Sequence, residues 1–427
     1  MKNLYIKTYG CQMNVYDSEK MAALLQPHGY RLHEQQDKAD LIILNTCHIR
    51  EKATEKVYSE LGRLPEKATV VVAGCVAQAE GEEIVKRAKN VDIVVGPQSY
   101  QNLPVLLEKL KREQKWQIDL DFADDEKFDK LPVKNVNKSY ASFLTVQEGC
   151  DKFCHFCCVP YTRGKEYSRP QAELVTEARQ LVAAGTQEIT LLGQNVSAYY
   201  NAGGLAALLQ KLAQLDGVQR LRYLTSHPRD MTDEALFDLH ANEPKLMPYL
   251  HLPVQSGSDS MLQAMNRKHT RDEYFAIIDK FTAARPDMAF SSDFIVGYPG
   301  ETDADHADTL DLVRRVPFGL CYSFKYSPRP GTPAAVLTNQ VPEAVKAQRL
   351  QELQELLQEK QMQFNKSCEG REFEVLFERK GKHDGQIMGK SPYLQAVVVQ
   401  GDETLLGQIK KVRVQKAMFS NLQAEVL

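Results

Sequence analysis

Three cysteines at C-x3-C-x2-C spacing, Cys150, Cys154 and Cys157, lie on one short segment of the chain. Each thiolate can bind one iron of a cubane [4Fe–4S] cluster, because such clusters are held by cysteine sulfur. Three ligands leave one iron open to a small molecule. A zinc knuckle or plain buried cysteines are the alternatives, but zinc sites usually add a second Cys or His pair nearby, and none follows here. We therefore predict an iron–sulfur site. The adjacent Cys158 is interpreted as a packing residue, since neighbours in an extended segment point to opposite sides.

A second set of cysteines, Cys11, Cys47 and Cys75, is dispersed in the sequence but occupies one kind of position. Each follows a predicted strand, and these strands are Leu4–Thr8, Asp40–Asn45 and Thr69–Ala73. The carboxyl ends of parallel strands lie on one edge of a sheet, where ligands bind. We therefore predict that the three cysteines converge on a second cluster. The alternative is three unrelated cysteines, which are common in cores.

The elements that must position these cysteines follow from the alternation of apolar and amphipathic segments. In residues 1–112 this alternation predicts a parallel sheet covered by helices. Residues 140–340 repeat it with six predicted strands and intervening helices, which indicates a full or partial (β/α) barrel with its chemistry at the carboxyl ends of the strands. The predicted strands are Ala141–Gln147, Glu188–Leu192, Arg220–Thr225, Tyr249–Leu252, Ala289–Val296 and Leu320–Tyr326. The Cys150 segment follows the first of them, as a barrel site requires.

The segments on either side of this central unit differ from it in composition and in predicted structure. Residues 116–139, rich in Lys, Asp and Asn, are predicted to be a linker, and Lys346–Lys366 a long charged helix. Residues 367–427 contain short alternating strands and glycine turns, which predict a small antiparallel barrel. The expected domains are therefore 1–115, 140–366 and 367–427.

Length and composition set the broad class. The chain has 427 residues, 43% of them hydrophobic, and a net charge of −3, so it is not a basic nucleic-acid binder as a whole. It has no apolar run long enough for a membrane span, and it opens as a strand rather than a signal peptide. We therefore expect a cytoplasmic protein without membrane association. In a reducing compartment its 9 cysteines are better explained as metal ligands or thiols than as disulfides.

The C-x3-C-x2-C motif, with Phe156 just before its last cysteine, resembles the radical S-adenosylmethionine (SAM) superfamily. The segments Val159–Gly164 and Ser168–Pro170 narrow the resemblance to the methylthiotransferases, as do Thr8–Asn14, Asn45–Cys47, Gly74–Ala77 and Arg329–Ala334. The resemblance covers essentially the whole chain. It implies an N-terminal α/β cluster domain, a central partial radical SAM barrel and a C-terminal TRAM domain.

The resemblance also implies cofactors and site residues. The cluster on Cys150, Cys154 and Cys157 would bind SAM and act in catalysis by reductive cleavage, and the N-terminal cluster would carry the sulfur that is inserted. A reducing partner such as a flavodoxin would supply electrons. Residues carried over as SAM contacts are Gln194, Asn195, Gln255 and Gly297, which follow predicted barrel strands. The TRAM resemblance favours RNA binding by Arg379, Lys380, Lys382, Lys410, Lys411 and Arg413, although their charges alone are equally consistent with a solvated face.

The resemblance further predicts a substrate. Asn45–Lys56 and Glu148–Gly164 are similar to the members that methylthiolate C2 of N6-isopentenyladenosine (dimethylallyladenosine) at position 37 of tRNA. The alternatives are methylthiotransferases of threonylcarbamoyl-adenosine in tRNA or of a ribosomal-protein aspartate, and, from another class, a two-cluster electron carrier, which would normally fill all four ligand positions of each cluster. The sequence does not predict the oligomeric state, the tRNA set or the sulfur source.

Overall fold

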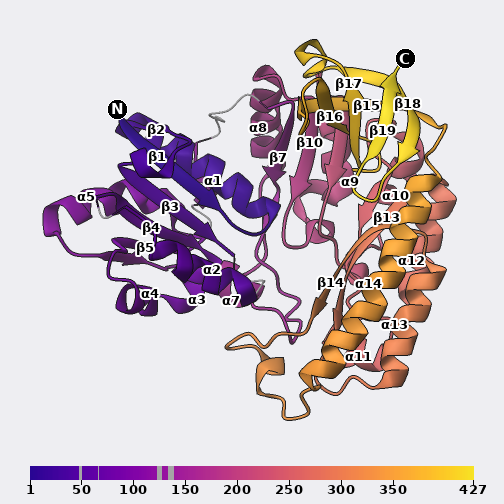
Figure 1. The fold of residues 1–427 in the computed structure, drawn as a ribbon, viewed down its shortest axis with the longest axis horizontal. Helices are drawn as coiled ribbons and strands as arrows, with labels where there is room; N and C mark the ends of the chain where they lie inside the picture. The colour runs from indigo at the N-terminus through magenta and orange to yellow at the C-terminus, as the bar shows by residue number, and fades with distance from the viewer. Residues whose placement is uncertain (48–50, 66, 123–126, 133–138) are drawn as a thin grey trace.

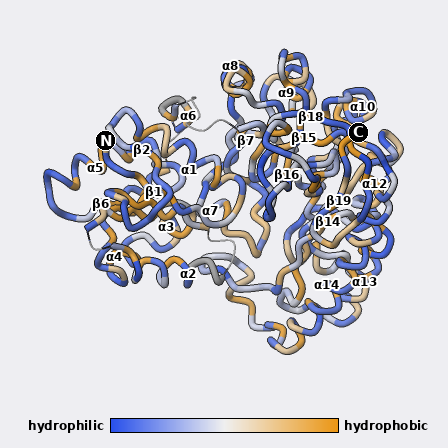
Figure 2. The backbone as a smooth tube through the Cα atoms, turned by 45° about the horizontal axis from the view of Figure 1, so that its top comes forward, coloured by the Kyte–Doolittle hydropathy of each residue, from blue (hydrophilic) through white to orange (hydrophobic). Residues whose placement is uncertain are grey.

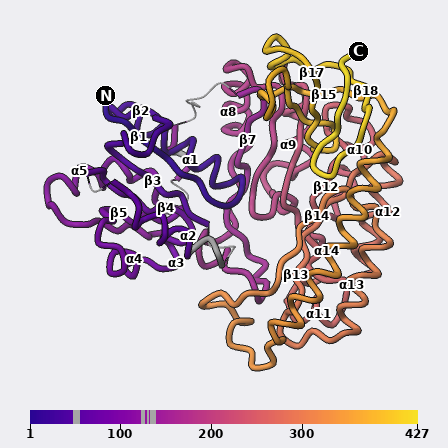
Figure 3. The backbone as a smooth tube through the Cα atoms, in the orientation of Figure 1, coloured from indigo at the N-terminus to yellow at the C-terminus, as the bar shows by residue number. Residues whose placement is uncertain are grey.

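The computed structural model describes residues 1–47, 51–65, 67–122, 127–132 and 139–427. Figure 1 shows an N-terminal domain on the left, a central domain of strands and helices, and a small barrel at the upper right. The tube in Figure 3 follows the same path and shows the long helix α14 (Glu343–Lys366) along the outside of the central domain. Residues 48–50 of the Asn45–Lys56 motif, and parts of the expected linker, lie outside the described residues.

The N-terminal domain is a six-stranded parallel sheet in the order β2-β1-β3-β4-β5-β6. Its strands are β1 (Lys2–Thr8), β2 (Tyr30–Leu32), β3 (Leu41–Thr46), β4 (Thr69–Gly74), β5 (Ile93–Val95) and β6 (Gln117–Asp119). Strands β3 and β4 are almost entirely buried, because helices cover both faces of the sheet. The central strands are correspondingly among the most hydrophobic parts of the tube in Figure 2.

Helices α1 (Gln12–Leu25) and α5 (Leu103–Glu113) pack on one face of this sheet. Helices α2 (Glu51–Leu61), α3 (Cys75–Glu80) and α4 (Glu82–Arg87) pack on the other. The parallel α/β prediction is confirmed, with one difference. Residues Gln117–Asp119, placed in the expected linker 116–139, form β6 and pair with β5. This strand was not predicted, because a three-residue edge strand is too short to show a hydrophobic period.

The central domain is a partial barrel of six parallel strands. They are β7 (Ala141–Thr145), β10 (Glu188–Leu192), β11 (Arg220–Tyr223), β12 (Tyr249–His251), β13 (Ala289–Val296) and β14 (Phe318–Lys325). They form two three-stranded sheets, which a bridge between Leu221 and Leu246 joins. The outer helices are α8 (Gln171–Ala183), α9 (Gly204–Ala213), α10 (Glu234–Asn242), α11 (Asp259–Ala264), α12 (Arg271–Ala284), α13 (Asp303–Arg315) and α14. All six predicted strands are confirmed.

The C-terminal unit is a closed barrel in the order β15-β16-β17-β19-β18. Its strands are β15 (Glu372–Lys380), β16 (Gln386–Lys390), β17 (Ala396–Gln400), β18 (Ile409–Ala417) and β19 (Leu422–Val426). The small barrel was predicted, but β16 was not, because glycine and lysine interrupt its short apolar pattern. Among the residues that the structure describes, no helix combines the length and apolarity needed to cross a lipid bilayer.

The C-terminal barrel docks on the amino ends of the central strands, opposite the edge where the chemistry is expected. Glu188 at the start of β10 accepts a hydrogen bond from Arg222 Nε at 2.9 Å and lies 3.5 Å from Arg220 Nη1. These two buried arginines donate onward to backbone carbonyl oxygens of the C-terminal barrel, those of Glu374, Lys390, Ser391 and Pro392.

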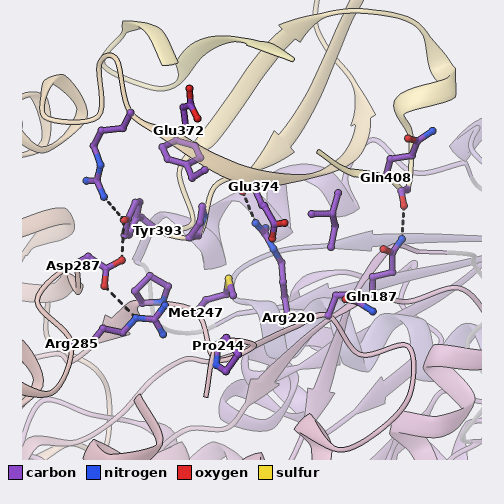
Figure 4. A pocket seen from close by; sticks show the side chains of 17 residues that line it. Gln187, Arg220, Pro244, Met247, Arg285, Asp287, Glu372, Glu374, Tyr393 and Gln408 are labelled. Carbon is purple, nitrogen blue, oxygen red and sulfur yellow. Dashed lines mark hydrogen bonds and ion pairs between the residues drawn. The ribbon is translucent and has the colours of Figure 1, made fainter. Parts of the chain in front are cut away.

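A cavity of about 720 Å³ lies beside this junction. Figure 4 shows Asp287 between Tyr393, whose hydroxyl donates to it at 3.1 Å, and Arg285, with which it pairs. Arg371 in turn donates to the Tyr393 hydroxyl at 2.7 Å. The lining residues thus satisfy one another across the domain boundary. Because the cavity lies at the amino ends of the strands, we interpret it as part of the junction and not as a cofactor site.

Candidate active site

The N-terminal cysteines lie on one edge of the sheet. Cys11 is the N-cap of α1, Cys47 comes directly after β3, and Cys75 is the first residue of α3. They follow β1, β3 and β4, which are neighbours in the sheet, so the structure brings the three strand ends together as their positions predict. A Cβ at Gly10, where φ is +103°, would lie 2.2 Å from Cβ of Cys47. Only glycine therefore permits this close approach of the two loops.

The second triad lies on the loop between β8 (Gln147–Glu148) and helix α7 (Val159–Arg163). Neighbouring elements hold this loop in place: His155 N donates to Met265 O at 3.0 Å, and Gly149 N donates to Gln194 Oε1 at 2.7 Å. Buried Arg267 places Nη1 3.5 Å from Sγ of Cys154. A guanidinium beside this thiolate is a charged hydrogen-bond donor that would stabilise its negative charge.

The two cysteine sets come near each other at the domain boundary, where α3, which starts at Cys75, packs against α7, which follows Cys158. Cys158, the N-cap of α7, is buried. Burial, and then the neighbouring Cys75, raise the pKa of its thiol to about 11. The prediction that Cys158 is a packing residue agrees with its burial, and its closeness to the other triad adds a feature that the sequence did not suggest.

The chemistry of the donor set fits iron–sulfur clusters. Burial raises the pKa of Cys11 and of Cys157, and raises that of Cys150 to about 11. These thiols are therefore protonated at neutral pH until a metal displaces the proton. Within the described part of the chain, no three His, Cys, Asp or Glu side chains are gathered around the position of a single metal ion. Cluster ligands bind different irons, so two open triads of thiols suit clusters better than a mononuclear ion.

The four residues carried over as SAM contacts lie at the carboxyl ends of barrel strands, as expected, but all four have hydrogen-bond partners within the protein. Gln194 binds the backbone of Gly149. Buried Asn195 donates to Asp230 at 2.6 Å and accepts from the backbone of His227.

The other two residues lie on strained turns. Gln255 has φ of +78° and bonds through its backbone to Asp293 and Ile295. Gly297 has φ of +71°, and a Cβ there would lie 2.3 Å from Cγ of Lys346 on α14. Its glycine is therefore explained by close packing in this turn. Their contact with SAM stays a prediction.

Two buried polar atoms after β11 have no hydrogen-bond partner among the described residues, Ser226 Oγ and His227 Nε2. The Nδ1 atom of His227 accepts from Arg229 N at 3.2 Å. Burial and then the charge of Arg267 lower the pKa of His227, so the ring is neutral and Nε2 carries the proton. Two unsatisfied donors at the carboxyl edge fit a polar cofactor, because buried polar groups normally have partners. The sequence pattern does not identify these two atoms, because their lack of partners depends on the packing of distant elements.

An apolar wall closes the site near the Cys150 loop. Phe156 packs with Met265, Tyr298 and Tyr326, among other buried residues. Sequence analysis identified Phe156 only by its position in the cysteine motif, since its partners come from distant loops. Such a wall excludes water from the space around the loop.

The predicted RNA-contacting cations lie on the C-terminal barrel. Arg379 and Lys380 end β15, Lys382 follows it, and Lys410, Lys411 and Arg413 lie on the neighbouring β18. Lys380 pairs with Glu403, and both Lys411 and Arg413 pair with Glu372. The strip is exposed, but acidic partners neutralise part of it.

Three family models match successive parts of this chain. Residues 3–96 match the model of uncharacterised protein family UPF0004, residues 144–313 match the radical SAM superfamily, and residues 366–427 match the TRAM domain. The chain is 59% identical to the tRNA-2-methylthio-N(6)-dimethylallyladenosine synthase of Rickettsia felis, and 58% identical to that of Rickettsia akari, over 100% of both chains in each case. The chain belongs to this synthase family.

Solved structures confirm the fold of the central part. A radical S-adenosylmethionine methyltransferase from Kitasatospora setae, solved with cobalamin and a [4Fe-4S] cluster, superposes with a TM-score of 0.59 at 13% identity, over 78% of this chain and 74% of that one. The cobalamin-dependent radical enzyme OxsB gives 0.53 at 12% identity, over 84% and 56%. At these identities the likeness concerns the fold alone.

Proposed function

We propose that this protein is an enzyme that methylthiolates C2 of N6-(dimethylallyl)adenosine at position 37 of tRNA. The observation that carries the proposal is the presence of two three-cysteine sets in a chain that matches the synthases along its full length. Helix α3, which starts at Cys75, contacts helix α7, which follows the Cys150 loop. The cofactors are two [4Fe–4S] clusters and SAM. An electron carrier would need neither the unpaired donors after β11 nor an RNA-binding domain.

In this proposal Cys150, Cys154 and Cys157 would hold the SAM-binding cluster, and Cys11, Cys47 and Cys75 the other. The first supplies, with SAM, a radical able to remove hydrogen from an unactivated carbon, and the second supplies the sulfur. The chain's own residues orient and protect this chemistry. Ser226 Oγ and His227 Nε2–H would donate to a polar group of the cofactor, and the apolar wall around Phe156 would keep water away.

The substrate and the reducing partner complete the proposal. The TRAM domain would bind tRNA through the cations of β15 and β18, with the electrostatic, salt-dependent affinity typical of phosphate contacts. Gln194, Asn195, Gln255 and Gly297 would shape the SAM pocket, directly or by fixing the loops around it. A flavodoxin-like protein would reduce the clusters in the cytoplasm.

The test uses bacteria that lack their own synthase of this kind. The chain is expressed there, bulk tRNA is digested, and 2-methylthio-N6-(dimethylallyl)adenosine is measured by mass spectrometry. We expect the wild type to restore it and Cys150→Ala and Cys47→Ala each to abolish it. Cys368→Ala, which removes a buried thiol in the C-terminal barrel, is the matched control and should retain activity. Unmodified dimethylallyladenosine in cells that contain cluster-loaded wild-type protein would overturn the substrate assignment. The test would then turn to threonylcarbamoyl-adenosine and the ribosomal-protein aspartate.

A further inference from the structure

Four buried charges meet where the N-terminal and central domains join. Arg163, the last residue of α7, places Nη1 2.7 Å from Glu148 and Nη2 2.8 Å from Asp17. Lys127, on the short helix α6 (Lys127–Lys130), lies 2.8 Å from Glu148 and 3.6 Å from Asp17. All four side chains are at most 2% exposed. Such a group is stable only as a balanced set, because an unpaired buried charge is costly.

Within this set, Arg163 is the member that reaches toward the N-terminal cysteines. Its Nη2 also donates to Asn14 Oδ1 at 2.8 Å. The amide of Asn14 in turn donates to the backbone oxygens of Tyr9 and Thr46, at 2.8 and 3.0 Å. Thr46 directly precedes Cys47, and Tyr9 lies two residues before Cys11. A residue of the central domain therefore fixes the two loops that carry N-terminal cysteines.

The pKa shifts of Cys11 and Arg163 are consistent with the position of the Arg163 guanidinium beside the N-terminal cysteines. Burial raises the pKa of Cys11, and the positive charge of Arg163 is the strongest opposing influence. Conversely, Asp17 and Cys75 are among the groups that raise the pKa of Arg163 against the effect of its burial. The guanidinium therefore favours negative charge at the N-terminal triad.

We propose that Arg163 is a positioning residue of the N-terminal cluster site, whose guanidinium completes that site from the central domain and raises the reduction potential of a cluster held there. This inference rests on the proposed function, since it requires that Cys11, Cys47 and Cys75 hold a cluster. Cluster potentials respond to nearby charge and hydrogen bonding. A positive charge beside the cluster stabilises the reduced, more negative state, so its removal should make the potential more negative.

Arg169 is a matched control, because its substitution tests what the loss of a buried arginine at the domain boundary does by itself. Like Arg163, it is a buried arginine of the central domain that joins α1: Nη2 lies 2.8 Å from Glu177, which also binds Lys20 of α1 at 2.7 Å. No cysteine is among the groups that shift its pKa. Loss of Arg169 should thus disturb domain docking without acting on the cluster.

The experiment measures midpoint potentials by EPR-monitored redox titration of the full chain. The background Cys150→Ala/Cys154→Ala/Cys157→Ala leaves only the N-terminal cluster. In it we expect Arg163→Gln to shift the potential to a more negative value, Arg163→Lys to restore much of the wild-type potential, and Arg169→Gln to leave it unchanged. If Arg163→Gln fails to fold, Arg163→Gln/Glu148→Gln removes one cation and one anion together and should give a smaller shift in the same direction, because the loss of the Glu148 charge partly offsets the loss of the guanidinium.

The outcomes separate this inference from the function on which it rests. An unchanged potential in both Arg163 variants, or an equal shift in Arg169→Gln, would overturn the role of Arg163 while leaving the reaction intact. Failure of the parent background to assemble any N-terminal cluster would instead overturn the proposed function. Retention of the cluster with a selective shift at Arg163 supports the inference.

Discussion

Glu188 should decide whether the C-terminal barrel stays docked, because it compensates two buried arginines. Burial opposes its ionisation, but Arg222 and then Arg220 hold the pKa of Glu188 below its usual value, so it is charged at neutral pH. Glu188→Gln removes the carboxylate that both guanidiniums share, while they still bond to the barrel's carbonyl oxygens. Breaking a buried pair in this way costs about 3–5 kcal/mol. Since 1.36 kcal/mol is a factor of ten, opening of the junction should become about 150- to 5,000-fold more frequent.

Amide hydrogen exchange measures this opening without requiring the whole chain to unfold in one step. We expect protection of the β15 and β18 amides to fall by about two to four orders of magnitude in Glu188→Gln, while the N-terminal sheet keeps its protection. Glu234→Gln is the control, because the Glu234–Lys280 pair is more than half exposed on both sides and exposed pairs contribute little. A fall of less than tenfold in β15 and β18, or an equal fall in the control, would refute the reasoning.

Three further predictions follow from other contacts. Cys158→Ala should bind as much iron and sulfide per chain as the wild type, because Cys158 is interpreted as packing; chemical analysis showing a loss of iron would instead identify a ligand. Arg267→Met should make the potential of the SAM-binding cluster more negative in EPR titration, since a charged donor to Cys154 is lost; an unchanged value would contradict this. Burial would raise the pKa of Asp305, but hydroxyl donors lower this pKa from 3.8 to about 2. The stabilisation that the ionised carboxylate provides is therefore complete above pH ~4 and is lost as the pH falls toward 2. The destabilisation by Asp305→Asn in urea unfolding should therefore shrink between pH 5 and pH 3, and an equal difference at both would exclude the mechanism.

Much of the site could be predicted because its ligands occupy positions that a parallel sheet makes equivalent. Cys11, Cys47 and Cys75 are far apart in sequence, yet each follows a strand, and the strand order then brings them to one edge. The six barrel strands were equally accessible, since each is a short apolar run bounded by turn residues. The start of α1 at Gln12, with Cys11 in the N-cap position, is visible only in the structure.

The charged residues that join the domains could not be predicted in the same way. In the sequence, nothing marks Arg163, Glu148 and Asp17 as different from ordinary surface charges. A local pattern does not distinguish a charged side chain that is solvated from one that is neutralised by a partner about 150 residues away. The same holds for Glu188 and Arg222 at the other junction. Hydrophobic periodicity predicts which side chains of a single helix or strand are buried. The charged side chains at the junctions, in contrast, are buried only when two domains meet.

These junctions also explain why the molecule has to place its domains so firmly. In the proposed reaction, sulfur held by one domain must meet a carbon activated by the other, and a displacement of about 1 Å is enough to slow such a step a hundredfold. An apolar interface alone would tolerate sliding, because apolar contacts are not directional. The pairs of Arg163 with Asp17 and of Lys20 with Glu177 cross the domain boundary with fixed hydrogen-bond directions, and a shifted register would leave buried charges unpaired. The cost of misalignment, more than the strength of the contact, is therefore what keeps the two cysteine triads opposite each other.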